Sequence, residues 1–105
     1  MTAIIAIGYG GQEEILRARK LIQDSGKNPD TLSREEFTRF VESAQYPPPD
    51  IIVRTGGHKR HSGYLLWLSE YAEYYFSDRN WPDFDLLEFE KVLEQYASSK
   101  RKFGK

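Results

Sequence analysis

Cysteine is absent from the 105 residues of this chain, which excludes a disulfide framework and a thiolate metal site. Long apolar runs are also missing: a membrane-spanning helix needs roughly 20 mostly apolar residues in succession, and no segment approaches that length. No signal peptide is recognisable. Hydrophobic residues at 39% and charged residues at 30% are ordinary for a globular protein. We therefore expect a single domain over residues 1–105, cytoplasmic and without a membrane span, for which peripheral membrane association stays open.

A large excess of one charge sign is also missing, because the formal net charge is only −1, but the charges are unevenly distributed. Residues 54–62 contain three basic and no acidic residues, and residues 98–105 contain four basic and no acidic residues. The rest of the chain is net acidic. Nucleic-acid-binding proteins present a broad basic face, so these two short segments favour a local anion-binding site and argue against nucleic acid as a partner.

Hydrophobic patterns and helix-start signals predict an α/β order of elements. Buried strands are expected at residues 2–7 and 51–53, and helices at residues 12–24, 33–44, 64–76 and 85–96. Capping pairs mark two of the helix starts, Ser33 with Glu36 and Asp85 with Glu88. A right-handed crossover would make the two strands parallel. Because two strands alone make a poor sheet, either residues 80–84 add a strand or a partner completes the sheet.

The helix expected at residues 64–76 is apolar nearly all round. Such a helix must be covered on more than one side, and in a chain this small a second subunit is the expected cover. Aromatic residues are enriched in interface cores. The residues expected at or near this contact are Trp67, Leu68, Tyr71 and Tyr75.

The most informative segment is residues 50–62, in which a β-branched run ends in Arg-Thr-Gly-Gly and is followed by basic residues. Ligands of open α/β sheets bind where strands end. Two glycines let the backbone approach a ligand, and exposed N–H groups near a helix start favour an anion. The side chains of Arg54, Lys59, Arg60 and Ser62 are therefore predicted to converge on a phosphorylated ligand. The alternative is that they form a solvated basic loop.

Several segments in a fixed order extend this interpretation. They are residues 7–12, 49–57, 60, 62, 65–67, 71–76, 81–84 and 101–104. Together they resemble the cis-prenyltransferases, the undecaprenyl diphosphate synthase type of polyprenyl synthase. The resemblance covers essentially the whole chain but only the C-terminal half of the family pattern. The 105 residues contain no match to the N-terminal half, which carries the Asp-Gly-Asn motif for the allylic diphosphate and metal.

The resemblance implies a partial parallel-sheet fold with helices packed on the sheet, completed by dimerisation or by a partner. It also implies a chemistry, the addition of isopentenyl diphosphate to an allylic diphosphate with Mg²⁺. The residues expected to bind the substrate diphosphate are Arg54, Arg60, Ser62, Gly56, Gly57 and, in the tail, Lys102. Glu73 matches a carboxylate that helps hold Mg²⁺ across the dimer; on its own sequence context it is equally an exposed residue at the edge of an interface. No catalytic residue is assigned.

Departures from the family pattern bear on activity. His58 replaces a Glu, Gly63 an Asn, Gln12 an Arg and Lys102 an Arg. Lysine keeps the charge of arginine but loses its bidentate geometry. The expected function is therefore the isopentenyl-diphosphate-binding half of a cis-prenyltransferase, inactive alone and acting as a fragment, a homodimer or a subunit beside a chain with the N-terminal motifs. The alternative is a non-enzymatic phosphate-binding or interaction module that retains the fold.

Overall fold

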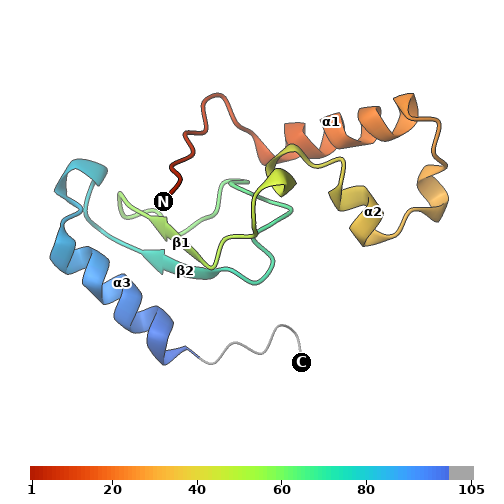
Figure 1. Cartoon of the computed structure of the whole chain (residues 1–105). Helices are drawn as coiled ribbons and strands as arrows, with labels where there is room; N and C mark the ends of the chain where they lie inside the picture. Colours follow the sequence, from red (N-terminus) through yellow and green to blue (C-terminus); the bar gives the residue numbers. More distant parts are fainter. Residues whose placement is uncertain (100–105) are drawn as a thin grey trace. The chain divides into compact units, whose positions relative to one another are not determined.

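The structure is a computed structural model that describes residues 1–99, and these form two compact units (Figure 1). The first unit contains Met1–Pro48 and Ser62–Leu68. The second contains Pro49–His61 and the chain from Ser69 onward. The chain therefore leaves the second unit after His61 and re-enters it at Ser69, so each unit is built from two separate segments.

Helix α1 (Gly11–Asp24) is the longest element of the first unit, and Ala18 and Ile22 on it are buried. It is followed by a 3₁₀ turn, η1 (Pro29–Thr31), and by helix α2 (Arg34–Thr38). The predicted capping box of α2 is confirmed. The Ser33 hydroxyl accepts from the Glu36 amide at 3.1 Å, and the Glu36 carboxylate accepts from the Ser33 amide at 2.9 Å.

The prediction that this helix continues to residue 44 is wrong. Helix α2 ends at Thr38, and a separate 3₁₀ turn, η2 (Glu42–Gln45), follows. The Thr38 hydroxyl donates to the Arg34 carbonyl at 2.7 Å, a local bond that competes with the helical backbone ladder. The backbone at Val41 is extended, and its side chain is buried. The apolar pattern continues from the helix through the turn after it, so the pattern alone does not mark where the helix ends.

The helix predicted at residues 64–76 is also absent. Ser62, Gly63 and Leu65 have φ angles of 51°, 74° and 48°, in the left-handed region that interrupts a right-handed helix. The chain forms turns instead, in which the Leu66 amide donates to the Gly63 carbonyl and the Leu68 amide to the Leu65 carbonyl. The same carbonyl of Gly63 explains why residue 11 is glycine, because a Cβ there would lie 2.0 Å from it.

The second unit contains a parallel pair of strands, β1 (Ile51–Arg54) and β2 (Glu73–Phe76), which lie side by side in Figure 1. Its register pairs Ile51 with Glu73 and Arg54 with Phe76. Strand β1 was predicted, whereas β2 was hidden in the predicted helix 64–76. Aromatic residues suit strands, but a short apolar run does not by its period distinguish a strand from a buried helix.

The prediction of a strand at residues 2–7 is wrong for the part of the chain that the structure describes. The side chains of Ile4, Ile5 and Ile7 are 55%, 83% and 90% exposed. A strand requires a neighbour for its backbone hydrogen bonds, and no described segment supplies one here. The predicted parallel pairing is therefore right in direction but joins β1 to β2. Residues 80–84 form no strand and contain the 3₁₀ turn η3 (Trp81–Asp83).

Helix α3 (Leu86–Ser98) ends the described part of the second unit. Its predicted cap is confirmed in part: the Asp85 carboxylate accepts from the Glu88 amide at 2.9 Å, but the Glu88 side chain turns elsewhere. Val92 on α3 and Ile52 on β1 are the buried apolar residues of this unit. Among residues 1–99, no helix combines the length and the apolar character that crossing a bilayer requires.

Candidate functional site

The loop that follows β1 is tied to the segment that follows β2 by three backbone hydrogen bonds. The Ser77 amide donates to the Arg54 carbonyl at 2.8 Å, which extends the strand pairing by one bond. The Gly56 amide donates to the Arg79 carbonyl at 2.7 Å, and the Gly57 amide to the Ser77 carbonyl at 3.0 Å. The amides of Gly56 and Gly57 are therefore engaged by backbone carbonyls of the segment after β2. Both are already bonded, and they shape the loop.

Gly56 and Gly57 are required by backbone conformation. Their φ angles are 87° and 76°, a region that residues with a Cβ rarely adopt. Crowding is not the reason, because a Cβ at either position would meet its nearest atom only at 3.7–3.8 Å. The two glycines let the chain turn directly after Arg54 and pass into the basic residues that follow.

Arg54 and Arg60 are brought together at the two ends of this loop. The Arg54 Nη1 atom donates to the Arg60 carbonyl oxygen at 2.6 Å, which closes the segment on itself. The residues at positions 58–60 are exposed. We call residues 54–60 the basic loop. Its three cationic side chains, Arg54, Lys59 and Arg60, have no acidic residue among them in the sequence.

The other two predicted binding residues are not among the described residues of the second unit. Ser62 belongs to the first unit, and its left-handed backbone begins the series of turns there rather than the predicted helix. Lys102 and the basic tail around it lie outside the described residues. Within the second unit, the structure therefore assembles four of the six predicted residues, namely Arg54, Gly56, Gly57 and Arg60.

Glu73 lies at the far end of the strand pair from the basic loop. It is the first residue of β2 and pairs with Ile51, whereas Arg54 pairs with Phe76. The two ends are three residue steps apart, which is roughly 10 Å along the strand direction. No group of three or more His, Asp or Glu residues within residues 1–99 is arranged to hold a metal ion. Glu73 therefore provides at most one carboxylate, and Mg²⁺ would need substrate phosphates or carboxylates from another chain.

Sequence reasoning missed a buried polar cluster beside the basic loop. Ser77 is 2% exposed and Glu88 is 7% exposed. The Ser77 hydroxyl donates to Glu88 Oε1 at 3.0 Å, and Lys91 Nζ donates to Glu88 Oε2 at 3.2 Å. These two hydrogen bonds hold the pKa of the Glu88 carboxyl below its ordinary value. The only sequence signal was the Asp85–Glu88 spacing, which indicated a helix cap and nothing about the loop.

A second buried carboxylate, Glu14 on α1, organises the first unit. It is 2% exposed and accepts from the Tyr9 hydroxyl at 2.6 Å and from the Ser43 amide at 2.7 Å. Burial opposes its ionisation, but the hydrogen bonds outweigh burial and lower the pKa of Glu14. The pKa of Tyr9 is raised, first by burial and then by Glu14. This pair connects the glycine-rich turn at residues 8–11 to η2.

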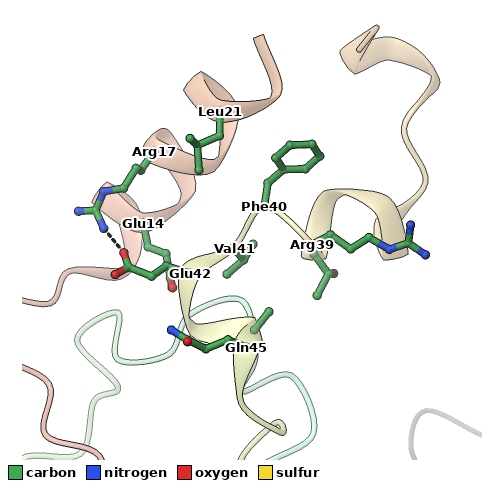
Figure 2. Close-up of a pocket in the computed structure, with 10 residues that line it drawn as sticks. Glu14, Arg17, Leu21, Arg39, Phe40, Val41, Glu42 and Gln45 are labelled. Carbon is green, nitrogen blue, oxygen red and sulfur yellow. Dashed lines mark hydrogen bonds and ion pairs between the residues drawn. The ribbon is translucent and has the colours of Figure 1, made fainter. Parts of the chain in front are cut away.

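The first unit also contains a hollow of about 740 Å³ between α1 and residues 38–45 (Figure 2). Leu21, Phe40 and Val41 supply apolar lining, and the exposed ion pair of Arg17 with Glu42 lies at its side. None of the predicted diphosphate-binding residues that the structure describes lines this hollow. The hollow is therefore separate from the basic loop in its lining and in its chemistry.

Comparison with known proteins identifies the family. The family described as putative undecaprenyl diphosphate synthase matches residues 1–104 of the chain. The chain belongs to this prenyltransferase family. Among curated relatives, the isoprenyl transferase of Aquifex aeolicus is 48% identical over 101 residues, which is 96% of this chain and 43% of the relative.

Solved structures of the prenyltransferase family confirm the α/β fold. A probable undecaprenyl diphosphate synthase from Campylobacter jejuni matches with a TM-score of 0.81 and 34% identity, over 95% of this chain and 46% of that one. Lavandulyl diphosphate synthase from Lavandula x intermedia, in complex with dimethylallyl diphosphate, matches with a TM-score of 0.84 and 29% identity, over 95% and 45%. This prenyltransferase-family chain thus spans less than half the length of the relatives it matches.

Proposed function

We propose that this chain is the isopentenyl-diphosphate-binding part of a cis-prenyltransferase. The observation that supports this function is the basic loop. Three cations and no acid lie where β1 ends, on a loop that Gly56 and Gly57 turn and that the Arg54–Arg60 contact closes. Arginine presents a planar set of donors that matches diphosphate oxygens in bidentate fashion. The family membership makes an isoprenoid diphosphate the natural ligand of such a loop.

The position of Glu73 favours a site that needs a second chain. Because Glu73 and Arg54 lie at opposite ends of the strand pair, we expect the two residues to serve different diphosphate sites. We infer that Glu73 serves the site of a neighbouring subunit, either a second copy or a chain that carries the Asp-Gly-Asn motif. Ser62 and Lys102 would complete the diphosphate site. Mg²⁺, when bound there, would neutralise part of the charge of the diphosphate.

By itself the chain would bind isopentenyl diphosphate without joining it to an allylic diphosphate. No Asp-Gly-Asn motif occurs in its 105 residues, and no group of three or more His, Asp or Glu residues among the described residues is arranged to hold a metal ion. We place this function in the cytoplasm, where isoprenoid diphosphates, as charged molecules, are dissolved. Peripheral association with a membrane is compatible with it.

Calorimetric titration of isopentenyl diphosphate into the chain tests this function. Arg54→Ala and Arg60→Ala should each weaken binding by about 1.5–3 kcal/mol, the scale of a hydrogen bond to a charged group. Arg19→Ala is the matched control, because it removes one exposed arginine from α1 in the first unit. Equal affinities for the wild type and both loop variants would contradict the proposal.

A further inference from the structure

The basic loop is held in place by residues outside it. In two of the three backbone hydrogen bonds that hold it, the carbonyls of Ser77 and Arg79 accept from the loop glycines. In the third, the Ser77 amide donates to the Arg54 carbonyl. The conformation of the segment at residues 77–79 therefore sets where the Gly56 and Gly57 amides, and with them the neighbouring arginine side chains, are located.

That segment is organised around one hydroxyl. The Ser77 Oγ atom accepts from the Arg79 amide at 3.2 Å and donates to Glu88 Oε1 at 3.0 Å. The first bond folds residues 77–79 into a serine turn. The second fixes the direction of the hydroxyl by anchoring it to a buried carboxylate on α3.

Glu88 has enough contacts to act as an anchor. Besides Ser77, its carboxylate accepts from the Tyr75 hydroxyl at 3.3 Å and from Lys91 Nζ at 3.2 Å, and Arg79 Nε lies 3.7 Å away. These partners come from β2, from the segment after it and from α3 itself. An ionised carboxylate only accepts hydrogen bonds, so it satisfies all of these donors at once.

We propose that Glu88 is a positioning residue, which acts through Ser77 to hold the basic loop in the conformation that receives the substrate diphosphate. This inference rests on the proposed function for the ligand, but its structural part stands on the contacts of the second unit alone. Glu88 itself lies on α3, outside the loop, and its carboxylate contacts Tyr75, Ser77, Arg79 and Lys91.

The low pKa of Glu88 agrees with this role. The hydrogen bonds from Ser77 and Lys91 lower it, so the carboxylate is ionised near neutral pH. The pKa of Tyr75 is raised, first by burial and then by the charge of Glu88, so its hydroxyl keeps the proton that it donates.

Four variants of the full chain test the proposal. Glu88→Ala removes the anchor, Glu88→Gln keeps an oxygen that accepts from Ser77, and Ser77→Ala removes the connecting hydroxyl. The matched control is Val92→Ala, which opens a cavity at another buried position of α3 and keeps every polar group of the cluster. Two readouts are needed: amide hydrogen exchange at Gly56 and Gly57, and the Kd for isopentenyl diphosphate and for inorganic pyrophosphate.

Glu88→Ala and Ser77→Ala should each speed exchange at both glycine amides and raise both Kd values about five- to tenfold, on the scale of one lost hydrogen bond. Glu88→Gln should stay nearer the wild type. Val92→Ala should lower the melting temperature without changing the Kd. The proposal is overturned if Glu88→Ala leaves glycine exchange at the wild-type rate, or if Val92→Ala weakens binding as much.

The two proposals fail in different ways. A wild-type chain that binds neither isopentenyl diphosphate nor pyrophosphate would contradict the proposed function, while glycine exchange would still decide whether Glu88 positions the loop. Should Glu88→Ala fail to fold, Ser77→Ala supplies the same two readouts from the other end of the contact.

Discussion

Glutamates 14 and 88 show how one residue type takes a structural role through its neighbours. Both carboxylates are buried, and both receive hydrogen bonds from hydroxyl groups, from Tyr9 in one unit and from Ser77 in the other. A buried charge is costly unless it is paired or hydrogen-bonded. Their positions in the sequence, on helical stretches with many other acids, do not distinguish them from exposed glutamates.

Acid should destabilise the chain through these two residues. Their pKa values in the folded state are lowered from 4.5, so their stabilising contribution is complete at neutral pH and is lost as the pH falls below about 4.5 through the folded-state values. Denaturant unfolding at pH 7 and at pH 3.5 measures this loss. Glu14→Gln should reduce the difference between the two pH values.

Exposed glutamates supply the control for this measurement. Glu94→Gln changes an exposed position on α3 and should leave the pH dependence as in the wild type. An unchanged pH dependence in Glu14→Gln would mean that the Tyr9–Glu14 contact does not survive in solution.

Among the features of the helices and strands, the helix starts are the ones that the local sequence predicts best in this chain. The capping box at Ser33 and the Asp85 cap both formed where their spacing predicts them. A cap is a contact between residues three apart, so it needs no partner from a distant part of the chain. Helix ends and short strands lack such a local signal.

Asp85→Ala should lower the free energy of unfolding by about 0.5–2 kcal/mol, because the first turn of α3 loses the acceptor of the Glu88 amide. Thermal or urea unfolding of the purified variant measures the change. Asp83→Ala removes another exposed acid close by, in η3, and should change stability much less. Equal losses in the two variants would assign the effect to general charge and not to the cap.

At the scale of the whole molecule, an oligomer is still expected, but an apolar helix is not the reason. The apolar helix 64–76 that suggested a subunit contact does not exist, and Trp67 donates from its indole to Thr38 at 2.9 Å within the first unit. The separation of Glu73 from the basic loop now supports the same expectation. Sedimentation at micromolar concentration should show a dimer, and a monomer at that concentration would contradict it.

The chain alone should not elongate prenyl diphosphates. Condensation requires the allylic diphosphate to be held within about 3–3.5 Å of the attacking carbon, and positioning of this kind supplies much of the rate. The motifs for that substrate are absent from the 105 residues. A radiolabelled isopentenyl diphosphate assay with farnesyl diphosphate and Mg²⁺ should give product only after a protein carrying the Asp-Gly-Asn motif is added.

One result would reverse this expectation. Mg²⁺-dependent polyprenyl product from the purified chain alone, abolished by Glu73→Gln, would show that Glu73 and the basic loop suffice when two copies meet. Product that Glu73→Gln leaves unchanged would point to a contaminating enzyme, and Arg54→Ala then serves as the second control.

The sequence by itself determined the family, the α/β class, the strand β1, both helix caps and the loop that gathers Arg54, Gly56, Gly57 and Arg60. Each of these depends on neighbouring residues or on a motif of fixed spacing. Tertiary structure alone decided that residues 73–76 form a strand, that residues 2–7 in this chain do not, and that the glycine amides are already bonded. It also decided the burial of Glu88 beside the loop. A strand and a buried polar contact both depend on groups far away in the sequence. The residue pattern of one segment does not indicate which distant segment it will contact.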